Sequence, residues 1–479
     1  MKNSFFLFFF FLFQWQFAQV DSLAVDSLEV NFNEVIIDSV FVDSLEVATF
    51  QNQIGNADAI KKFCQKLKQL EEQKNCKLRI VHIGDSHIQA DLFTGKMRSL
   101  LQQKYGNGGL GFTFPHNLAK TNGNHYIKYN ATAPFESYRN IYQDSTKPVG
   151  LSGIALFTTS KDFAIELQVR DKFYVFNSLK LVMPNNQRLF DVATTSKEII
   201  MESAVPKTIS HKIKSGEALS IIASKYGVSV TAIKKANGLK SNNIQAGKTL
   251  RIPTKQMEPK KIVRSEFEPL PLFEDIVSQN FYSPEPIEKI YLVSNSAATS
   301  YALNGLVLEN NDSGIVYSAI GVNGAKASDY NRFPEFFQQL QAIEADLVVI
   351  SLGTNESFDK QNSTVYFENL QKMIAEIRAK NPSVEILVLT PPPSLFKRKF
   401  PNTFVADYAK VIQEKASENS YAVWDMFQAM GGLFNVNKNF NRGYMSKDKV
   451  HYSKLGYEKQ AELFFEALEF NYEQFKSAQ

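Results

Sequence analysis

The 479-residue sequence has little cysteine, little net charge and, beyond its first residues, no long apolar run. Cys64 and Cys76 are the only cysteines, which excludes a disulfide-dense scaffold, although the two could pair in an oxidising compartment. A formal net charge of +4 gives no general reason to expect nucleic acid as a partner. No segment after the N-terminus reaches the roughly 20 apolar residues of a membrane-spanning helix. With 44% hydrophobic and 21% charged residues the chain is typical of globular proteins, and its length predicts two to four domains.

Residues 1–19 are the exception to this pattern. Met1-Lys2 is followed by an apolar run from Phe5 to Phe13 and by the small residue Ala18. This order predicts a secretory signal peptide, although an apolar N-terminal strand or helix would have the same composition. We therefore expect an exported protein, soluble after signal removal, that is periplasmic, associated with the cell wall, or secreted. Residues 20–57 repeat Asp-Ser-Leu and Asp-Ser-Val units without a helical period, which predicts an extended spacer.

Apolar runs and helical patterns alternate in two separate parts of the chain, residues 58–120 and 316–479. A buried strand is expected over 78–83, and near-continuous apolar runs at 346–352 and 384–390 are typical of parallel strands covered on both faces. Strands that alternate with helices predict an α/β domain with a parallel sheet. Helices are expected over residues 58–73, 92–101, 333–343, 364–380, 402–418 and 453–468.

The segment between these two parts, residues 121–315, has a different pattern. Short β-like runs separated by Lys-Asp and Asn-Ser turns predict a β-rich insert. Inside it, residues 207–253 hold nine Lys and Arg against one acid, Glu217, so the rest of the chain has a net charge of about −4. The positive total therefore belongs to one small module.

A candidate nucleophile follows the first predicted strand. Gly84-Asp85-Ser86-His87 lies at its carboxyl end, where open α/β sheets place their ligands, although a serine there can also be a simple helix cap. A serine nucleophile needs a base, and the chain has six histidines. His451 suits this role because Asp448, three residues earlier, can orient the ring and stabilise its charged form. The other histidines are less well placed: His82, His87, His116, His125 and His211.

Two further turns follow predicted strands and carry donors for an oxyanion. Gly353-Thr354-Asn355 comes after one apolar run, and Gly324 lies in a turn after another. An Asn amide and a Gly N–H, with the N–H of Ser86, are suitable donors to a tetrahedral oxyanion, although ordinary turns also use Gly and Asn. We expect no metal ion and no cofactor, because the alternative metal ligands lie where neighbouring side chains point in different directions: His82, Asp85 and His87.

The order of these motifs resembles that of the SGNH (GDSL-type) esterase superfamily. Gly84-Asp85-Ser86 is similar to its first block, Gly324 to its second, Gly353-Thr354-Asn355 to its third and Asp448-x-x-His451 to its fifth. The resemblance implies a three-layer, flavodoxin-like α/β sandwich. It also implies that Ser86, Asp448 and His451 are catalytic, and that Ser86, Gly324 and Asn355 form the oxyanion hole. The sequence departs from the family pattern in two places, with His87 for the usual Leu and Glu356 for the usual Asp.

The insert and its basic module have resemblances of their own. A β-rich, jelly-roll-like insert at this position is similar to that of bacterial peptidoglycan O-acetylesterases. The stretch from His211 to Pro253 resembles a LysM repeat along nearly its full length. LysM modules have βααβ order and bind N-acetylglucosamine-containing glycans between two loops, which correspond here to Gly216-Glu217-Ala218 and Asn243-Ile244-Gln245. A nucleic-acid surface is the alternative, but only Tyr226 is available for base stacking, and we expect no nucleic-acid partner.

Together these patterns predict an exported serine esterase that removes O-acetyl groups from peptidoglycan or another N-acetylglucosamine-containing glycan. An O-acetyltransferase, an esterase of other acylated glycans or lipids, and an inactive glycan-binding scaffold are the alternatives. The predicted segments are a signal peptide (1–19), a spacer (20–57), the first hydrolase part (58–120), the first insert part (121–206), the LysM module (207–256), the second insert part (257–315) and the second hydrolase part (316–479).

Overall fold

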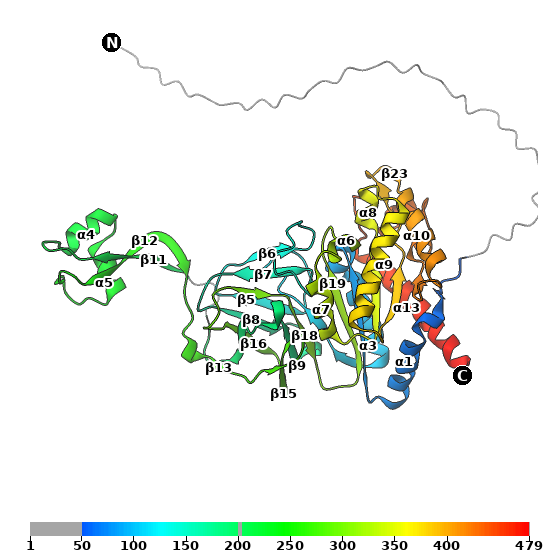
Figure 1. The fold of residues 1–479 in the computed structure, drawn as a ribbon, viewed down its shortest axis with the longest axis horizontal. Coiled ribbons are helices and arrows are strands. Elements are labelled where there is room, and N and C mark those ends of the chain that lie inside the picture. The colour runs from blue at the N-terminus through cyan, green and yellow to red at the C-terminus, as the bar shows by residue number, and fades with distance from the viewer. Residues whose placement is uncertain (1–49, 200–203, 479) are drawn as a thin grey trace, which may run out of the picture. The chain divides into compact units, whose positions relative to one another are not determined.

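The computed structural model describes residues 50–199 and 204–478 (Figure 1). The predicted signal peptide and most of the predicted spacer lie outside the described residues. Within the described part of the chain, none of the helices combines the length and the apolar character that crossing a membrane requires.

A seven-stranded sheet forms the centre of the hydrolase domain. Neighbouring strands of this sheet run parallel, except for β1 and β24 at one edge, which run antiparallel. Of the first three long strands in the chain, the first lies in the middle of the sheet, between the second and the third. This order is flavodoxin-like and confirms the predicted fold class. The strand order is β1 (Ile54–Gly55), β24 (Ala422–Trp424), β21 (Glu385–Leu389), β20 (Leu347–Ser351), β2 (Lys77–Gly84), β19 (Gly314–Gly321) and β3 (Asn107–Gly109).

Helices cover both faces of this sheet, which explains why its strands are apolar on both sides. Side chains of β2 alternate between two cores: Leu78 and Ile80 belong to one, Val81 and Ile83 to the other. The first core also contains side chains of α1 (Lys61–Gln73), α3 (Leu92–Tyr105) and α13 (Lys454–Ser477). The second contains side chains of α7 (Pro334–Leu340), α9 (Ser363–Lys380) and α10 (Thr403–Lys415).

The insert consists mainly of two five-stranded antiparallel sheets whose buried side chains, such as Leu167 and Leu179, share one core. β4 already belongs to the insert, so its sheets begin before the expected residue 121; the glycines around β3 and β4 carry no strand pattern in the sequence. The first sheet is β13 (Glu268–Pro269), β10 (Phe190–Thr194), β16 (Lys289–Ser294), β8 (Ala164–Val169) and β5 (Ile127–Ala131). The second is β14 (Phe273–Glu274), β15 (Gln279–Ile287), β9 (Phe176–Val182), β18 (Gly305–Glu309) and β4 (Gly111–Thr113).

The remaining elements are short. A three-stranded sheet consists of β17 (Tyr301–Leu303), β7 (Ile154–Thr158) and β6 (Glu136–Arg139), and a hairpin of β22 (Leu395–Phe396) and β23 (Phe400–Pro401). The short helices are α2 (Ser86–Gln89), α6 (Ala327–Tyr330), α8 (Thr354–Phe358), α11 (Met426–Ala429) and α12 (Val436–Asn441). Cys64 and Cys76 are free thiols, so the alternative of a disulfide is not realised.

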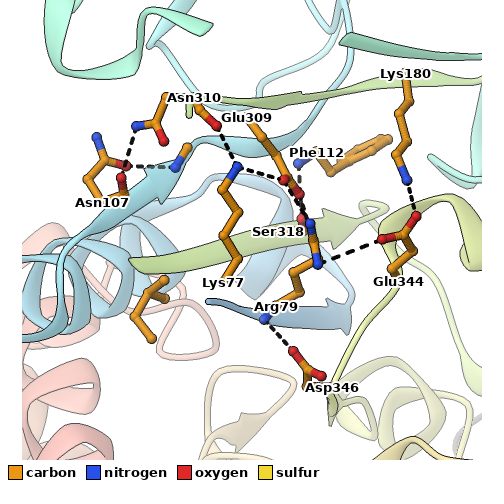
Figure 2. A network of polar contacts seen from close by, with 12 residues as sticks. Lys77, Arg79, Asn107, Phe112, Lys180, Glu309, Asn310, Ser318, Glu344 and Asp346 are labelled. Atoms are coloured by element: carbon orange, nitrogen blue, oxygen red, sulfur yellow. Dashed lines mark hydrogen bonds and ion pairs between the residues drawn. The ribbon is translucent and has the colours of Figure 1, made fainter. Parts of the chain in front are cut away.

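A polar network joins the parallel sheet to the insert (Figure 2). Arg79 on β2 donates to both carboxylate oxygens of Glu309, at the end of β18, with distances of 2.7 and 3.0 Å. Lys77 donates to the same carboxylate at 3.1 Å. Burial alone would raise the pKa of Glu309, but the bonds from Arg79 and Lys77 hold it below its ordinary value. Because a buried charge is tolerated only when it is paired, the carboxylate of Glu309 in the insert depends on the two cations of β2.

The basic module has the βααβ order that its sequence predicts. It consists of β11 (Ala204–Lys212), α4 (Leu219–Tyr226), α5 (Val230–Asn237) and β12 (Thr249–Pro259). β11 and β12 pair antiparallel, and Gly227 and Gly238 end the two helices in the left-handed conformation. A small separate core includes Leu219, Ile222 and Ile233.

Candidate active site

The turn after β2 places Ser86 at the carboxyl edge of the parallel sheet. A Cβ on Gly84 would lie 2.7 Å from the carbonyl oxygen of Ser351 and 2.4 Å from the side chain of Ile88, so the turn requires glycine here. Asp85 caps the following short helix by accepting a hydrogen bond from the His87 N–H at 2.9 Å. The half-buried Ser86 therefore begins α2 with a supported backbone.

Ser86, His451 and Asp448 form a continuous chain of hydrogen bonds. Ser86 Oγ lies 2.9 Å from His451 Nε2, and His451 Nδ1 lies 2.8 Å from Asp448 Oδ2. The other carboxylate oxygen of Asp448 accepts the backbone N–H groups of Val450 and His451. Burial would raise the pKa of Asp448, but the hydrogen bonds from the His451 ring and from these N–H groups lower it. An ionised carboxylate, an oriented imidazole and a serine hydroxyl in this order can perform nucleophilic acyl transfer.

The two predicted oxyanion loops lie beside the serine turn, because β19, β2 and β20 are neighbours in the sheet. The Asn355 amide donates to the Ala325 carbonyl at 2.9 Å and to Asp85 Oδ2 at 3.1 Å. Gly324 is exposed and has a φ of +85°, a conformation that strongly favours glycine. One edge of the sheet thus collects Ser86, Gly324 and Asn355, while their roles as oxyanion donors stay predictions.

Two further side chains fix these loops: Gln89, which no sequence motif pointed to, and Glu356, which the sequence marked only as a departure from the family pattern. Gln89 on α2 accepts a hydrogen bond from the Asn323 N–H at 2.5 Å through Oε1. The fully buried Glu356 on α8 accepts one from the Ala327 N–H at 2.9 Å. Burial raises the pKa of Glu356 to about 7, and its second oxygen has no partner among the described residues. The signal in the sequence for Gln89 is its position close to the serine motif, and for Glu356 its place beside Asn355 where the family usually has Asp.

Two histidines near the serine turn, His82 and His87, bond to hydroxyl groups outside the triad. His82 lies 2.9 Å from the hydroxyl of Tyr317 and 2.6 Å from that of Ser351. His87 Nδ1 lies 2.9 Å from the Tyr457 hydroxyl. Burial lowers the pKa of both rings to about 3, so both are neutral near pH 7. Across residues 50–199 and 204–478, no group of three or more His, Cys, Asp or Glu is placed to hold a metal ion, so the alternative based on His82, Asp85 and His87 gains no support.

The predicted glycan loops of the basic module lie alongside each other. The Gly247 N–H donates to the Ile213 carbonyl at 2.8 Å, and the Ile213 N–H donates to the Lys248 carbonyl at 2.9 Å. The loop of Gly216, Glu217 and Ala218 follows Ile213, and the loop of Asn243, Ile244 and Gln245 precedes Gly247. The Glu217 carboxylate is already engaged, because it contacts His211 Nε2 on β11 and accepts the Lys214 N–H, at 2.8 Å each. Ile244 packs partly against the core of the module.

Comparisons with known proteins identify two regions of the chain. Residues 294–459 match the GDSL-like Lipase/Acylhydrolase family, and residues 211–253 match the LysM domain. The chain therefore carries a GDSL-like lipase/acylhydrolase domain and a LysM domain. The first match includes Gly324, Asn355, Asp448 and His451; Ser86 precedes it because the insert separates the serine motif from the other motifs.

Two curated relatives match only the LysM region. The chain is 49% identical over 43 residues to "Probable peptidoglycan endopeptidase LytE" of Bacillus subtilis (strain 168), which is 9% of this chain and 13% of that protein. It is 50% identical over 44 residues to "Probable autolysin SsaALP" of Staphylococcus aureus (strain NCTC 8325 / PS 47), 9% of this chain and 17% of that protein. The chain thus spans less than a fifth of either relative.

A solved structure of a peptidoglycan O-acetylesterase, "Peptidoglycan O-acetylesterase in action, 5 min", has a similar fold over most of the chain. Its TM-score is 0.59 and its sequence is 22% identical, and the alignment covers 88% of this chain and 98% of that one. The shared fold therefore includes the insert as well as the parallel sheet.

Proposed function

We propose that this protein, which carries a GDSL-like acylhydrolase domain and a LysM domain, is an exported serine esterase that removes O-acetyl groups from cell-wall peptidoglycan. The observation that supports an esterase most directly is the chain of hydrogen bonds from Ser86 Oγ through His451 to Asp448. Ser86 follows β2, which lies between β19 and β20 at the point where the strand order of the sheet reverses direction. Flavodoxin-like sheets bind their ligands at this point.

The geometry supports a two-step acyl transfer. His451 Nε2 takes the proton from Ser86 Oγ, which attacks the acetyl carbonyl carbon, while Asp448 stabilises the charged ring. The oxyanion accepts hydrogen bonds from the N–H groups of Ser86 and Gly324 and from the Asn355 amide, which exchanges one of its two bonds, to Ala325 or to Asp85, for the bond to the oxyanion. His451 then returns the proton to the departing sugar oxygen, leaving acetyl-Ser86. Water, deprotonated by His451, attacks this ester and releases acetate and the free serine.

The LysM domain supports the cell wall as the location of the substrate. The curated relatives that match this domain carry the names "Probable peptidoglycan endopeptidase LytE" and "Probable autolysin SsaALP". A weak glycan-binding module in the same chain raises the local concentration of acetylated glycan at the esterase without tight binding. The apolar N-terminal run supports export.

Replacement of Ser86 by Ala tests the function. We expect the variant to lose acetate release from O-acetylated peptidoglycan by a factor of about 10⁴ or more, while its binding to the insoluble glycan persists. A fluorophosphonate probe should label the wild type and not the variant. Full activity in the variant, or a wild type that the probe does not label, contradicts a serine esterase. Parallel assays on an acetylated xylan and a lipid ester, and with a sugar acceptor added, distinguish the other substrates and acetyl transfer.

A further inference from the structure

A basic surface of the hydrolase domain borders the catalytic loop and has no role in the mechanism above. It is formed by residues 391–402, which include the hairpin of β22 and β23, and by residues 431–450, which include α12 and Asp448. These two segments, called the basic rim below, hold seven Lys and Arg and a single acid, Asp448 itself. The seven cations are Lys397, Arg398, Lys399, Lys438, Arg442, Lys447 and Lys449.

The hairpin of the basic rim is attached to the loop that carries two members of the triad. The Leu395 N–H donates to the Lys449 carbonyl at 2.9 Å. The Tyr452 hydroxyl donates to the Pro393 carbonyl at 3.0 Å. Lys449 and Tyr452 each follow a triad residue directly in the chain. The hairpin and the catalytic loop therefore share one edge of the active site.

The hairpin also contacts the helix that begins at the asparagine motif. The ring of Phe396 stacks on that of Phe358, with the ring centroids 5.6 Å apart. Phe358 is the last residue of α8, and Figure 1 shows β23 next to this helix. A group bound to the hairpin is therefore held beside the elements that carry Asn355 and His451.

The charges of the basic rim are available to a ligand. Six of the seven cations are exposed, and Lys449 is half-buried. None of the seven forms an ion pair with another of the residues that the structure describes, and the carboxylate of Asp448 is engaged by His451. Unpaired cations of one sign around an active site attract anions and raise the rate at which an anionic substrate associates.

Apolar surface accompanies these charges. Phe400 and Phe434 belong to the two segments of the basic rim and are exposed. The ammonium group of Lys399 lies over the ring of Phe400, 5.2 Å from its centroid, so charge and aromatic surface occur together at the hairpin. Cations spread over two segments match several carboxylates rather than one. An acidic peptide, which combines several carboxylates with carbon chains, fits this surface better than a single small anion does.

We propose that the basic rim binds the carboxylates of an acidic peptide attached to the O-acetylated glycan. This inference rests on the proposed function, since it names the substrate class that the same active site takes. An anionic lipid surface has matching charge, but a bilayer placed on the rim would also cover the loop that carries Asp448 and His451. The esterase therefore acts on glycan that still carries its peptides, before any hydrolysis that separates the peptide from the sugar.

The test compares the hairpin variant Lys397→Gln/Lys399→Gln with two controls, all in the full chain with its LysM domain. Lys397→Arg/Lys399→Arg changes the same side chains and keeps their charge. Lys372→Gln/Lys380→Gln removes the same charge from exposed positions of α9. We expect the ratio of kcat/KM on soluble, peptide-bearing O-acetylated glycan to kcat/KM on 4-nitrophenyl acetate to fall about fivefold in the hairpin variant, because exposed charge pairs contribute modestly. Both controls should keep the wild-type ratio. An unchanged ratio in the hairpin variant overturns the proposal.

Removal of the peptide from the substrate tests the source of the carboxylates. An amidase is used to separate the peptides from the same O-acetylated glycan before the assay. The wild type should then lose about fivefold in kcat/KM, whereas the hairpin variant should change by less than about twofold, since its contact with the peptide is already weakened. Equal wild-type rates on glycan with and without peptides overturn the proposal.

A third measurement separates this inference from the esterase assignment. Non-acetylated, peptide-bearing glycan fragments are added as inhibitors of 4-nitrophenyl acetate hydrolysis, and they should inhibit the wild type about fivefold more strongly than the hairpin variant. A wild type that is inhibited in this way but releases no acetate from glycan retains the peptide site and contradicts the substrate reaction. Equal inhibition of both proteins, with vesicles of equal parts phosphatidylglycerol and phosphatidylcholine bound by the wild type only, overturns the proposal in favour of an anionic lipid surface.

Discussion

Asn355 donates a hydrogen bond to Asp85 Oδ2 at 3.1 Å, and so connects the oxyanion loop after β20 to the serine turn after β2. The same amide contacts the Ala325 carbonyl in the loop after β19. Asp85 is almost fully buried, and its other oxygen accepts the His87 N–H. One carboxylate therefore orients both the proposed oxyanion donor and the helix turn that carries the nucleophile.

Asp85→Asn should lower kcat without removing the triad. An amide in place of the carboxylate presents an NH2 group to either the Asn355 amide or the His87 N–H, so one of these bonds is lost. We expect kcat on 4-nitrophenyl acetate to fall about 10- to 100-fold with a smaller change in KM, since the contact orients a group used in the transition state. Asp407→Asn, at an exposed position of α10, is the control. An unchanged kcat in Asp85→Asn would show that Asn355 needs no such support.

Glu356→Gln should stabilise the protein at alkaline pH. Burial raises the pKa of Glu356 from 4.5 to about 7, so between these values the folded protein retains a proton that the unfolded chain has released. The free energy of unfolding therefore falls as the pH rises through this window. Glutamine keeps the oxygen that accepts the Ala327 N–H and cannot ionise. Relative to the wild type, the variant should gain about 1–3 kcal/mol between pH 4 and pH 8.

Urea unfolding at both pH values measures this gain. Glu368→Gln, which changes an exposed carboxylate on α9, should show the pH dependence of the wild type. A Glu356→Gln variant whose stability runs parallel to that of the wild type would contradict a raised pKa at this residue.

His87 should make the folded protein less stable as the pH falls, and its effect on stability should depend on Tyr457. Burial lowers the pKa of His87 to about 3, so below about pH 6.5 the unfolded chain binds a proton that the folded protein does not, and stability falls as the pH falls. His87→Leu alone leaves the Tyr457 hydroxyl without its partner, and Tyr457→Phe alone leaves His87 Nδ1 without one. The double variant should be about 1 kcal/mol more stable than the sum of the single effects predicts.

Denaturant unfolding of all four proteins at pH 5 and pH 7.5 tests both parts of this prediction. Variants without His87 should lose less stability on acidification than the wild type. Additive single effects would mean that the hydroxyl and the imidazole do not depend on each other.

Removal of the LysM domain should affect glycan binding but not the chemistry at Ser86. Residues 204–206 pair with 257–259, so an Asn-Gly turn between Pro206 and Met257 can close the hairpin after deletion of 207–256. We expect kcat/KM on 4-nitrophenyl acetate to stay within about twofold and activity on insoluble peptidoglycan to fall about tenfold at low enzyme concentration. Binding of the intact protein to the glycan should weaken as salt rises from about 0.1 to about 1 M, because nine cations face one acid in this module. Equal loss on both substrates would indicate that the insert needs the module to fold.

Patterns within short stretches of the sequence were sufficient to predict the architecture. The apolar runs at 346–352 and 384–390 are β20 and β21, and the expected helix over 364–380 is α9, because strand and helix periodicity reflect burial of consecutive residues. Boundaries were less certain: α13 continues to Ser477, beyond the expected residue 468, since its apolar positions still contact the core there. The LysM region was predictable along its length because its small core comes from residues close together in the chain.

The sequence by itself determined the fold class and the order of the motifs around Ser86, Asn355 and His451, because these depend on residues adjacent in the chain. It could not show that Asp85, Gln89 and Glu356 hold the three loops together, since their partners lie on other strands and turns. Nor could it show that a loop of the insert lies beside the oxyanion loop. Only the tertiary structure decides such contacts, because burial and hydrogen bonding between distant segments depend on how the sheet and the insert pack.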